Sequence, residues 1–178
     1  MRIVAGSRKG RRIAAPRGAG TRPTGDRVRE AIFALLGPVE GAAVLDLFAG
    51  SGALGLEALS RGAASCLFVE RDREACRVIE RNLSTLDLPG GRVLCRGVPE
   101  ALRGEAARRR RYDLVLVDPP YDEWPRYEPL LARLLPPVLA PGARVVVETE
   151  ARAEPQLPLD LVTTRRYGSA RATVFRAP

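Results

Sequence analysis

The sequence has no histidine, a single lysine (Lys9) and few aromatic residues, which make up 5% of its 178 positions. The absence of histidine excludes a histidine-based catalytic triad, a histidine general base and a histidine metal ligand. Only three cysteines occur, Cys66, Cys76 and Cys95, and none belongs to a Cys-x-x-Cys pair. A zinc site or a dithiol redox motif is therefore not expected, and we predict no metal. We expect the three cysteines to be buried free thiols in a reducing compartment.

Long apolar runs are absent as well. No stretch approaches the roughly 18 apolar residues of a membrane span, and residues 1–9 lack the apolar core of a signal peptide. We therefore expect a cytoplasmic protein without membrane association. The composition, 46% hydrophobic and 28% charged, is that of a folded chain, and the length suits one domain with a packed core.

Positive charge is concentrated at the N-terminal end. The net charge is +8, and residues 1–30, with nine cations and two acids, carry +7 of it. A basic arm beside a near-neutral domain is typical of nucleic-acid-binding proteins, although a solvated arginine-rich tail is the alternative. We predict RNA binding for five of these cations, Arg8, Lys9, Arg11, Arg12 and Arg22. A second cluster, Arg108 to Arg111, is expected to end a helix, where cations meet the negative end of the dipole.

Apolar segments and turn residues alternate along the chain. Residues 2–5 and 11–14 predict a small N-terminal hairpin, and a helix is expected from an N-cap at Thr24 or Asp26 to Leu36. Further strands are expected over 43–47, 66–69, 92–95, 113–117 and 144–148. Further helices are expected over 53–61, 72–86 (with Asp72 as N-cap), 99–109 and 127–135. Residues 161–163 and 172–175 are expected to form a closing hairpin. We expect a basic arm over residues 1–22 and one α/β domain over residues 23–178.

The alternation of strands and helices predicts a mostly parallel sheet with helices on both faces. In such sheets, ligands bind beyond the carboxyl ends of the strands. Chemically unusual residues follow the expected strands at that edge, namely Asp46 to Gly52, Glu70, the residues after Cys95, and Asp118 to Tyr121. The sequence therefore predicts one site at this edge of the sheet.

The segment from Asp46 to Gly55 joins the first core strand to a helix and contains Gly-x-Gly-x-x-Gly at residues 50–55. Glycines at these positions let the backbone approach a ligand closely. The pattern matches the dinucleotide fingerprint, but Asp46 stands where a pyrophosphate would come near, which argues against NAD(P). An acid there suits a ligand with an ammonium group, such as the methionine part of S-adenosylmethionine. Glu70, at the next strand end, can accept hydrogen bonds from both ribose hydroxyls.

Asp118-Pro119-Pro120-Tyr121 follows another apolar strand. The prolines stiffen the backbone and remove two N–H donors, which leaves the Pro119 carbonyl as an acceptor beside the Asp118 carboxylate. Two acceptors and the Tyr121 ring suit a planar base with an exocyclic amine. Such an amine is a weak nucleophile because its lone pair is delocalised, and hydrogen bonds from both of its N–H groups favour a pyramidal nitrogen aimed at an electrophilic methyl group. We predict catalysis by positioning and electrostatics, with Tyr121 stacked on the base.

These motifs resemble a known family. DLFAGSG (46–52) followed by DPPY (118–121) looks like the amino-group class of S-adenosylmethionine-dependent methyltransferases. Over nearly its whole length the chain is similar to the bacterial 16S rRNA guanine-N2 methyltransferase family, through MRIVAGSRKGRRI (1–13), RPTGDRVREAIFALLG (22–37), LGLEALSRGA (54–63) and FVERD (68–72). The resemblance implies a Rossmann-like, seven-stranded fold, mostly parallel with a C-terminal antiparallel hairpin.

The resemblance also implies the reaction and its partners. The expected reaction is methyl transfer from S-adenosylmethionine to the N2 amine of a guanine in small-subunit rRNA, with S-adenosylhomocysteine as the product. The substrate is expected within an assembled or assembling ribosomal particle, and we expect the protein to be a monomer. The guanine amine would be held by Asp118, Pro119, Pro120 and Tyr121.

Cofactor contacts carry over by motif. The methionine part would lie on Asp46, Phe48, Ala49, Gly50, Ser51 and Gly52, the ribose on Glu70, and the adenine beside Arg71, with Thr24 near the pocket. The chain departs from the family where many relatives carry Asp or Asn for the adenine amine, because Gly97 stands there. We expect backbone groups at Gly97 and Val98, or water, to take over that contact. The family's aromatic residue between Gly6 and Gly10 is also missing.

Three other functions remain open from the residues alone. The same chemistry could act on adenine N6 or cytosine N4 of DNA, or on another RNA, although the chain has no separate target-recognition domain. The protein could be a non-catalytic RNA-binding assembly factor, which would have no need of the acceptors at residues 118–121. An NAD-linked oxidoreductase rests only on the glycine spacing.

Overall fold

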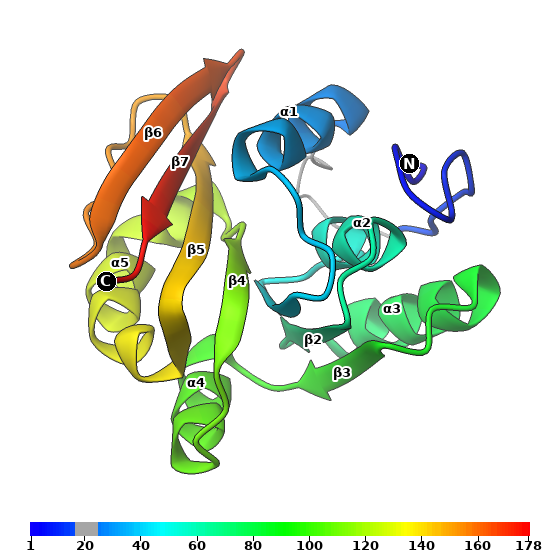
Figure 1. Ribbon diagram of the computed structural model, residues 1–178, viewed down its shortest axis with the longest axis horizontal. Helices are drawn as coiled ribbons and strands as arrows, with labels where there is room; N and C mark the ends of the chain where they lie inside the picture. The colour runs from blue at the N-terminus through cyan, green and yellow to red at the C-terminus, as the bar shows by residue number, and fades with distance from the viewer. Residues whose placement is uncertain (17–24) are drawn as a thin grey trace.

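Strands alternate with helices in the predicted order. A computed structural model describes residues 1–16 and 25–178 (Figure 1). The helices are α1 (Asp26–Leu36), α2 (Ala53–Ser60), α3 (Arg73–Leu86), α4 (Val98–Ala107) and α5 (Trp124–Leu134), with short 3₁₀ turns η1 (Tyr121–Glu123) and η2 (Pro136–Val138). The strands are β1 (Ala43–Leu47), β2 (Ser65–Glu70), β3 (Gly91–Cys95), β4 (Tyr112–Val117), β5 (Leu139–Glu150), β6 (Asp160–Tyr167) and β7 (Ala170–Arg176).

The seven strands of the described residues form one sheet in the order β3-β2-β1-β4-β5-β7-β6. Strands β1 to β5 pair in parallel, whereas β7 runs antiparallel to both β5 and β6. The predicted Rossmann-like fold, mostly parallel with a C-terminal antiparallel hairpin, is confirmed. The strand order reverses between β1 and β4, which is the place where doubly wound sheets bind ligands.

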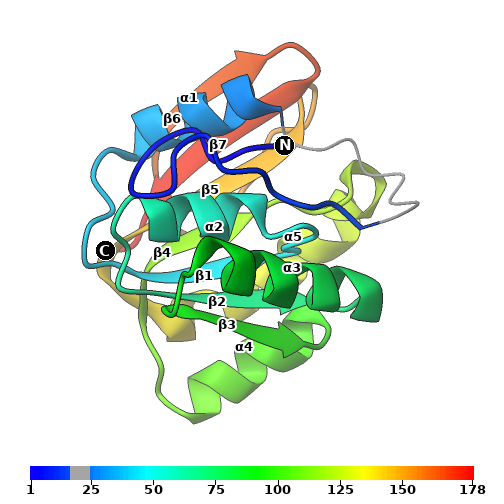
Figure 2. The ribbon, with the colours of Figure 1, turned by 90° about the vertical axis from the view of Figure 1, so that its right-hand side faces the viewer.

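Helices cover both faces of the sheet. Helices α1, α2 and α3 lie on one face, and α4 and α5 lie on the other (Figures 1 and 2). Because successive strand residues point to opposite faces, Val44, Phe68 and Leu116 pack with the first three helices. Leu45 and Val117 pack with α4 and α5. The core therefore has two apolar layers with the sheet between them.

The N-terminal arm is docked on α2 and α3 (Figure 2). Instead of two strands it contains one antiparallel bridge, between Arg2 and Arg12, and it buries Ile3 and Ile13. At Gly6, which has φ +82°, a Cβ atom would lie 1.8 Å from the carbonyl oxygen of Ser60. Only glycine therefore allows this close approach of the arm to the end of α2.

A buried ion cluster joins the arm, α1 and α2. Glu57 of α2 is fully buried and accepts hydrogen bonds from the backbone nitrogens of Val4 (2.8 Å) and Ala5 (2.9 Å). It also pairs with Arg61 at 2.7 Å and with the fully buried Arg29 of α1 at 3.7 Å. These partners are what compensate a carboxylate removed from water.

Some element bounds differ from the prediction. Gly25 is the N-cap of α1, rather than Thr24 or Asp26, and Thr24 lies outside the described residues. Helix α5 begins at Trp124, three residues early, because a proline is tolerated in the first turn of a helix. The last three strands, β5, β6 and β7, extend beyond the predicted ranges.

Other local predictions are confirmed or corrected. Asp72 caps α3, since its carboxylate accepts a hydrogen bond from the backbone nitrogen of Ala75 at 2.8 Å. Cys66 and Cys76 are buried, but Cys95 is exposed, because it ends an edge strand of the sheet. No helix among the described residues has the length and apolar character needed to cross a membrane.

Candidate functional site

Four carboxylates stand in a row at the carboxyl ends of adjacent parallel strands. Asp46 lies in β1, Glu70 ends β2, Asp118 follows β4, and Glu148 lies near the end of β5. The strand register places all four on the face that carries α1 to α3. They line one cavity of about 930 Å³, which is within the usual size range of ligand pockets.

The loop between β1 and α2 forms the floor of the cavity. Phe48, Ala49, Gly50 and Ser51 line it, as predicted for the cofactor loop. The turn is tight, since the backbone nitrogen of Gly52 donates to the carbonyl of Ala49 at 2.6 Å. Phe48 has φ +60°, a conformation that is rare for residues other than glycine and costs free energy. Such strain is common where a backbone is shaped for a ligand.

Gly55 brings α2 against the strands beneath it. A Cβ atom there would lie 2.3 Å from Cε1 of Phe68, 2.6 Å from Sγ of Cys66 and 2.8 Å from Oδ2 of Asp46. Without a side chain, the backbone nitrogen of Gly55 donates to that Asp46 oxygen at 2.9 Å. The third glycine of the pattern therefore serves packing between helix and strand and holds the first acid in place.

The environment of Asp46 favours its neutral form in the ligand-free protein. Burial raises the pKa of the Asp46 carboxyl to about 8, and repulsion from Asp118 and Glu70 adds to this. The hydrogen bond from Gly55 acts in the opposite direction. A cationic group bound beside Asp46 would reverse this balance and favour the carboxylate.

Glu70 is fixed by the backbone around it. Its carboxylate accepts hydrogen bonds from the backbone nitrogens of Gly50 (2.8 Å), Arg71 (2.7 Å) and Asp72 (2.8 Å). It therefore ties the glycine loop to the end of β2, and of its roughly four acceptor sites about one is left for a ligand hydroxyl.

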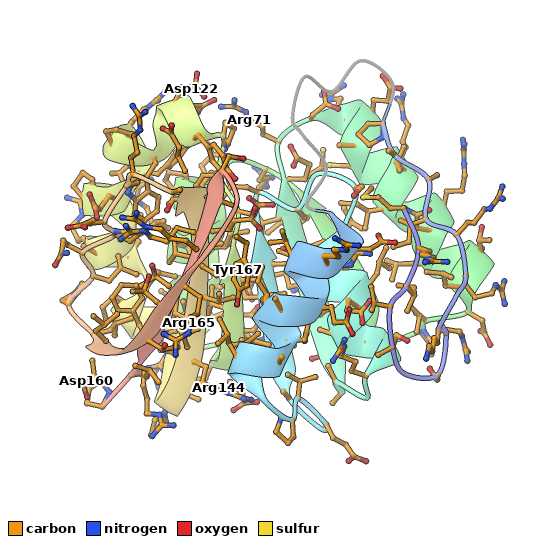
Figure 3. The ribbon with its side chains drawn as sticks, turned by 90° about the horizontal axis from the view of Figure 1, so that it is seen from above. Arg71, Asp122, Arg144, Asp160, Arg165 and Tyr167 are labelled. Atoms are coloured by element: carbon orange, nitrogen blue, oxygen red, sulfur yellow. The ribbon has the colours of Figure 1, made fainter. Side chains whose placement is uncertain are left out.

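Arg71 connects the Glu70 side of the cavity to the turn after β4. Its guanidinium donates to Glu123 of η1 at 2.7 Å, and Figure 3 shows it beside the turn that contains Asp122. Arg71, Asp122 and the predicted cofactor residue Val98 all line the cavity.

The predicted catalytic segment reaches the same cavity. Asp118, Pro119, Pro120 and Tyr121 all line it, directly across the switch point from Asp46. Tyr121 is 39% exposed, and its hydroxyl donates to Oε1 of Glu148 at 3.4 Å. The geometry therefore places two acceptor groups and an aromatic ring next to a glycine loop.

Not every predicted residue lines the cavity. Gly52 and Gly97 shape the backbone next to it without lining it, and Thr24 and Arg22 lie outside the described residues. The sequence analysis missed several lining residues, among them Met1, Ala15, Pro16, Leu54, Glu74, Arg96, Tyr127, Glu148, Glu150 and Ser169. Glu148 had a detectable signal, because it follows an apolar strand as Asp46 and Asp118 do.

Two of the predicted RNA-binding cations, Arg8 and Arg11, donate hydrogen bonds to backbone carbonyls within the protein. Arg8 is partly enclosed and donates to the carbonyls of Leu86 and Asp87 at the end of α3. Arg11 donates to the carbonyl of Thr85 at 2.9 Å but has an exposed side chain, as do Lys9 and Arg12. Arg8 therefore caps a helix, which leaves the exposed cations as the better candidates for phosphate contacts.

Residues 1–16 and 25–178 contain no group of three or more Cys, Asp or Glu side chains placed to bind an ion. The acids of the cavity are spread along four strands, and Glu70 is directed at backbone nitrogens. The arrangement suits recognition of an organic cation and of hydrogen-bond donors.

Comparison with known proteins identifies relatives of the chain. The model of a family described as Conserved hypothetical protein 95 matches residues 1–176. The chain is 40% identical over 182 residues to "Putative rRNA methyltransferase YlbH" of Bacillus subtilis, covering 99% of this chain and 98% of the relative. It is 44% identical over 122 residues to "Ribosomal RNA small subunit methyltransferase D" of Escherichia coli, covering 68% and 60% of the two chains.

A solved structure agrees with these matches. A hypothetical protein of Thermus thermophilus superposes with a TM-score of 0.84 at 32% identity, covering 98% of both chains. The family match spans the arm, the glycine loop and the segment at residues 118–121 together. The chain therefore belongs to the ribosomal RNA small subunit methyltransferase D family.

Proposed function

We propose that the protein transfers a methyl group from S-adenosylmethionine to the exocyclic N2 amine of a guanine in small-subunit rRNA. The observation that carries this proposal is that one cavity holds both the Asp46 to Ser51 loop and the Asp118-Pro119 acceptor pair. The relatives named as rRNA methyltransferases support rRNA as the substrate. The choice of guanine N2 rests on the resemblance to the guanine-N2 methyltransferase family, because the acceptors at residues 118–121 suit any planar base with an exocyclic amine.

The residues present fit S-adenosylmethionine. The strained turn at Phe48 and Gly50 brings backbone close to the cavity, Asp46 faces the place for an ammonium group, and Glu70 lies within reach of a ribose. When bound, this cofactor supplies an electrophilic methyl group on a sulfonium. A row of acids suits such a cation, whereas it would repel the pyrophosphate of NAD(P).

The chain's own residues would then prepare the amine. The Asp118 carboxylate and the Pro119 carbonyl accept its two N–H groups, which favours a pyramidal nitrogen with its lone pair aimed at the methyl group. Tyr121 stacks on the base and fixes its plane. After transfer the nitrogen carries a surplus proton, and Asp118 is the base placed to accept it. Positioning and electrostatics supply most of the rate.

The arm would contact RNA outside the cavity. Lys9, Arg11 and Arg12 present exposed cations, which can bind phosphates without sequence preference. We further propose that the substrate is an assembled or assembling small subunit and that the protein acts as a monomer. Methylation of naked rRNA and of subunits, compared side by side, tests the first of these, and sedimentation tests the second.

The decisive experiment is methyl incorporation from labelled S-adenosylmethionine into small ribosomal subunits from cells that lack this gene, followed by nucleoside analysis. N2-methylguanosine as the single product is expected. Asp118→Ala should abolish turnover while S-adenosylhomocysteine still binds. Label in adenosine or cytidine would favour the other amines, and no label despite cofactor binding would favour an RNA-binding assembly factor. Binding of NADH instead would overturn the cofactor assignment.

A further inference from the structure

Glu148 is a buried carboxylate in the cavity that the proposed reaction does not use. It is 5% exposed and lies near the end of β5. The register of β4 with β5 runs to Val117 opposite Val147, so that Asp118 and Glu148 are the next residues of the two strands. Both lie on the same face of the sheet, and neighbouring strands are ~4.8 Å apart.

Glu148 lines the cavity together with Asp118 and Tyr121. On the other side, its partner in β7 is Ala172, which offers no polar side chain. The Tyr121 hydroxyl donates to its Oε1 at 3.4 Å and thereby links it to the stacking platform. A carboxylate accepts about four hydrogen bonds, so Glu148 can accept from a ligand donor in addition to the Tyr121 hydroxyl.

We propose that Glu148 accepts a hydrogen bond from N1–H of the target guanine and so selects guanine over other amino-bearing bases. This inference rests on the proposed function. Guanine has one N–H group on N1 and two on N2; N1–H and the neighbouring N2–H are nearly parallel, and the second N2–H points toward the N3 side. Three acceptors line the cavity, namely Glu148, the Asp118 carboxylate and the Pro119 carbonyl, and the first two are neighbours across β4 and β5.

The same carboxylate would reject the competing bases. Adenine presents the N1 lone pair beside its amine, and cytosine presents the N3 lone pair. When such a lone pair faces a buried carboxylate, no hydrogen bond forms and the two groups repel each other. An unpaired buried polar group lowers the binding free energy far more than a missing methyl group does. The segment at residues 118–121 selects an amine, and Glu148 adds the choice of which base carries it.

A base analogue separates this role from a structural one. 2-Aminopurine keeps the amine on C2 but has a lone pair at N1 instead of N1–H. The modified guanine is first mapped with the wild-type protein, and 2-aminopurine is then placed at that position of the rRNA by ligation. The measured quantity is the ratio of kcat/KM for guanine to kcat/KM for 2-aminopurine. It is measured for the wild type, for Glu148→Gln and for the control Glu80→Gln. Glu80 is an exposed residue of α3.

We expect the wild type and Glu80→Gln to favour guanine by about 100-fold. Glu148→Gln should lower this ratio to below about tenfold, because its amide can donate to N1 of the analogue, with S-adenosylhomocysteine affinity unchanged. If Glu148→Gln and the wild type had the same guanine to 2-aminopurine ratio, the role of Glu148 would be overturned but the proposed function would stand. Equal use of both bases by the wild type would do the same, even if the variant failed to fold. Absence of N2-methylguanosine at the mapping step would overturn the proposed function as well.

Discussion

The side-chain nitrogen of Asn82 lies 3.1 Å from the carbonyl oxygen of Ser51 and donates a hydrogen bond to it. The same side chain donates to the carbonyl of Ala14 at 3.0 Å and accepts from its backbone nitrogen at 2.9 Å. Asn82 is 3% exposed, so no bulk water replaces these bonds. One buried amide in α3 thus ties the basic arm to the glycine loop.

Replacing Asn82 with Ala should therefore weaken cofactor binding although Asn82 does not line the cavity. The loop carbonyl and both arm groups would lose their partner, and each such loss costs about 1–3 kcal/mol. We expect about a tenfold lower affinity for S-adenosylhomocysteine by calorimetry. Glu80→Gln, also on α3 but exposed, is the control. An unchanged affinity would show that the loop holds its shape without the arm.

Asp46 should make the ligand-free protein less stable as the pH rises. The pKa of its carboxyl is about 8 when folded against an ordinary value near 3.8, so the folded state holds a proton that the unfolded state loses between these values. Stability then falls with pH in that window, by up to about 1.4 kcal/mol per unit. Asp46→Asn removes this slope. Denaturant unfolding of the wild type and of Asp46→Asn from pH 5 to 8 tests this prediction. If their free energies of unfolding differed by the same amount at every pH, the prediction would be contradicted.

Gly55→Ala should destabilise the fold, because the new methyl group would meet Phe68, Cys66 and Asp46 below 3.0 Å. Overpacking of this kind costs about 1–3 kcal/mol. Gly97→Ala is the matched control, since a Cβ atom there has no neighbour within 4 Å. Thermal unfolding should separate the two variants clearly. Similar melting temperatures would mean that α2 can move away from the sheet.

Glu57→Gln should be more harmful than its conservative shape suggests. The buried Arg29 and the nearby Arg61 would lose a negative partner, and breaking a buried ion pair from one side costs about 3–5 kcal/mol. Unfolding in urea should show this loss, together with faster proteolysis of the arm. If only the arm became sensitive, the cluster would hold the arm without stabilising the domain.

Lys9 and Arg12 together should account for part of the salt dependence of RNA binding. Their replacement by Ala should lower the slope of log affinity against log salt concentration by about 1 to 2. Arg8→Ala, by contrast, should lower the melting temperature, because Arg8 caps α3. Filter binding over a salt series gives the slopes. A larger effect of Arg8 on the slope would reverse these assignments.

The sequence predicted the parallel strands well because their apolar runs are continuous and bounded by polar residues. Strand β1 has the predicted bounds, and β2 and β3 differ from them by one residue at most at each end. Strand β5 was predicted too short, because Pro141 and Gly142 interrupt its pattern while the strand continues through them. Long-range pairing overrides local preference there.

Site residues were predictable where they lie at the end of an apolar strand or in the loop that directly follows it. Asp46, Glu70 and Asp118 are such residues. Glu150 and Ser169 required knowledge of how distant strands line up, which no local pattern contains. The cluster of Arg29 with Glu57 was missed because an arginine on a helix is usually solvated. Arg29 lies three residues before Ile32 and seven before Leu36, which was a readable sign of burial.

The row of acids also has a directional consequence for a nucleotide that approaches the cavity. Phosphates are repelled by the ionised carboxylates that line the cavity, so that the backbone of the nucleotide is kept outside it. A base edge rich in N–H groups experiences the opposite force. The field therefore orients a flipped nucleotide before any contact is made, with its base inward and its phosphates outward.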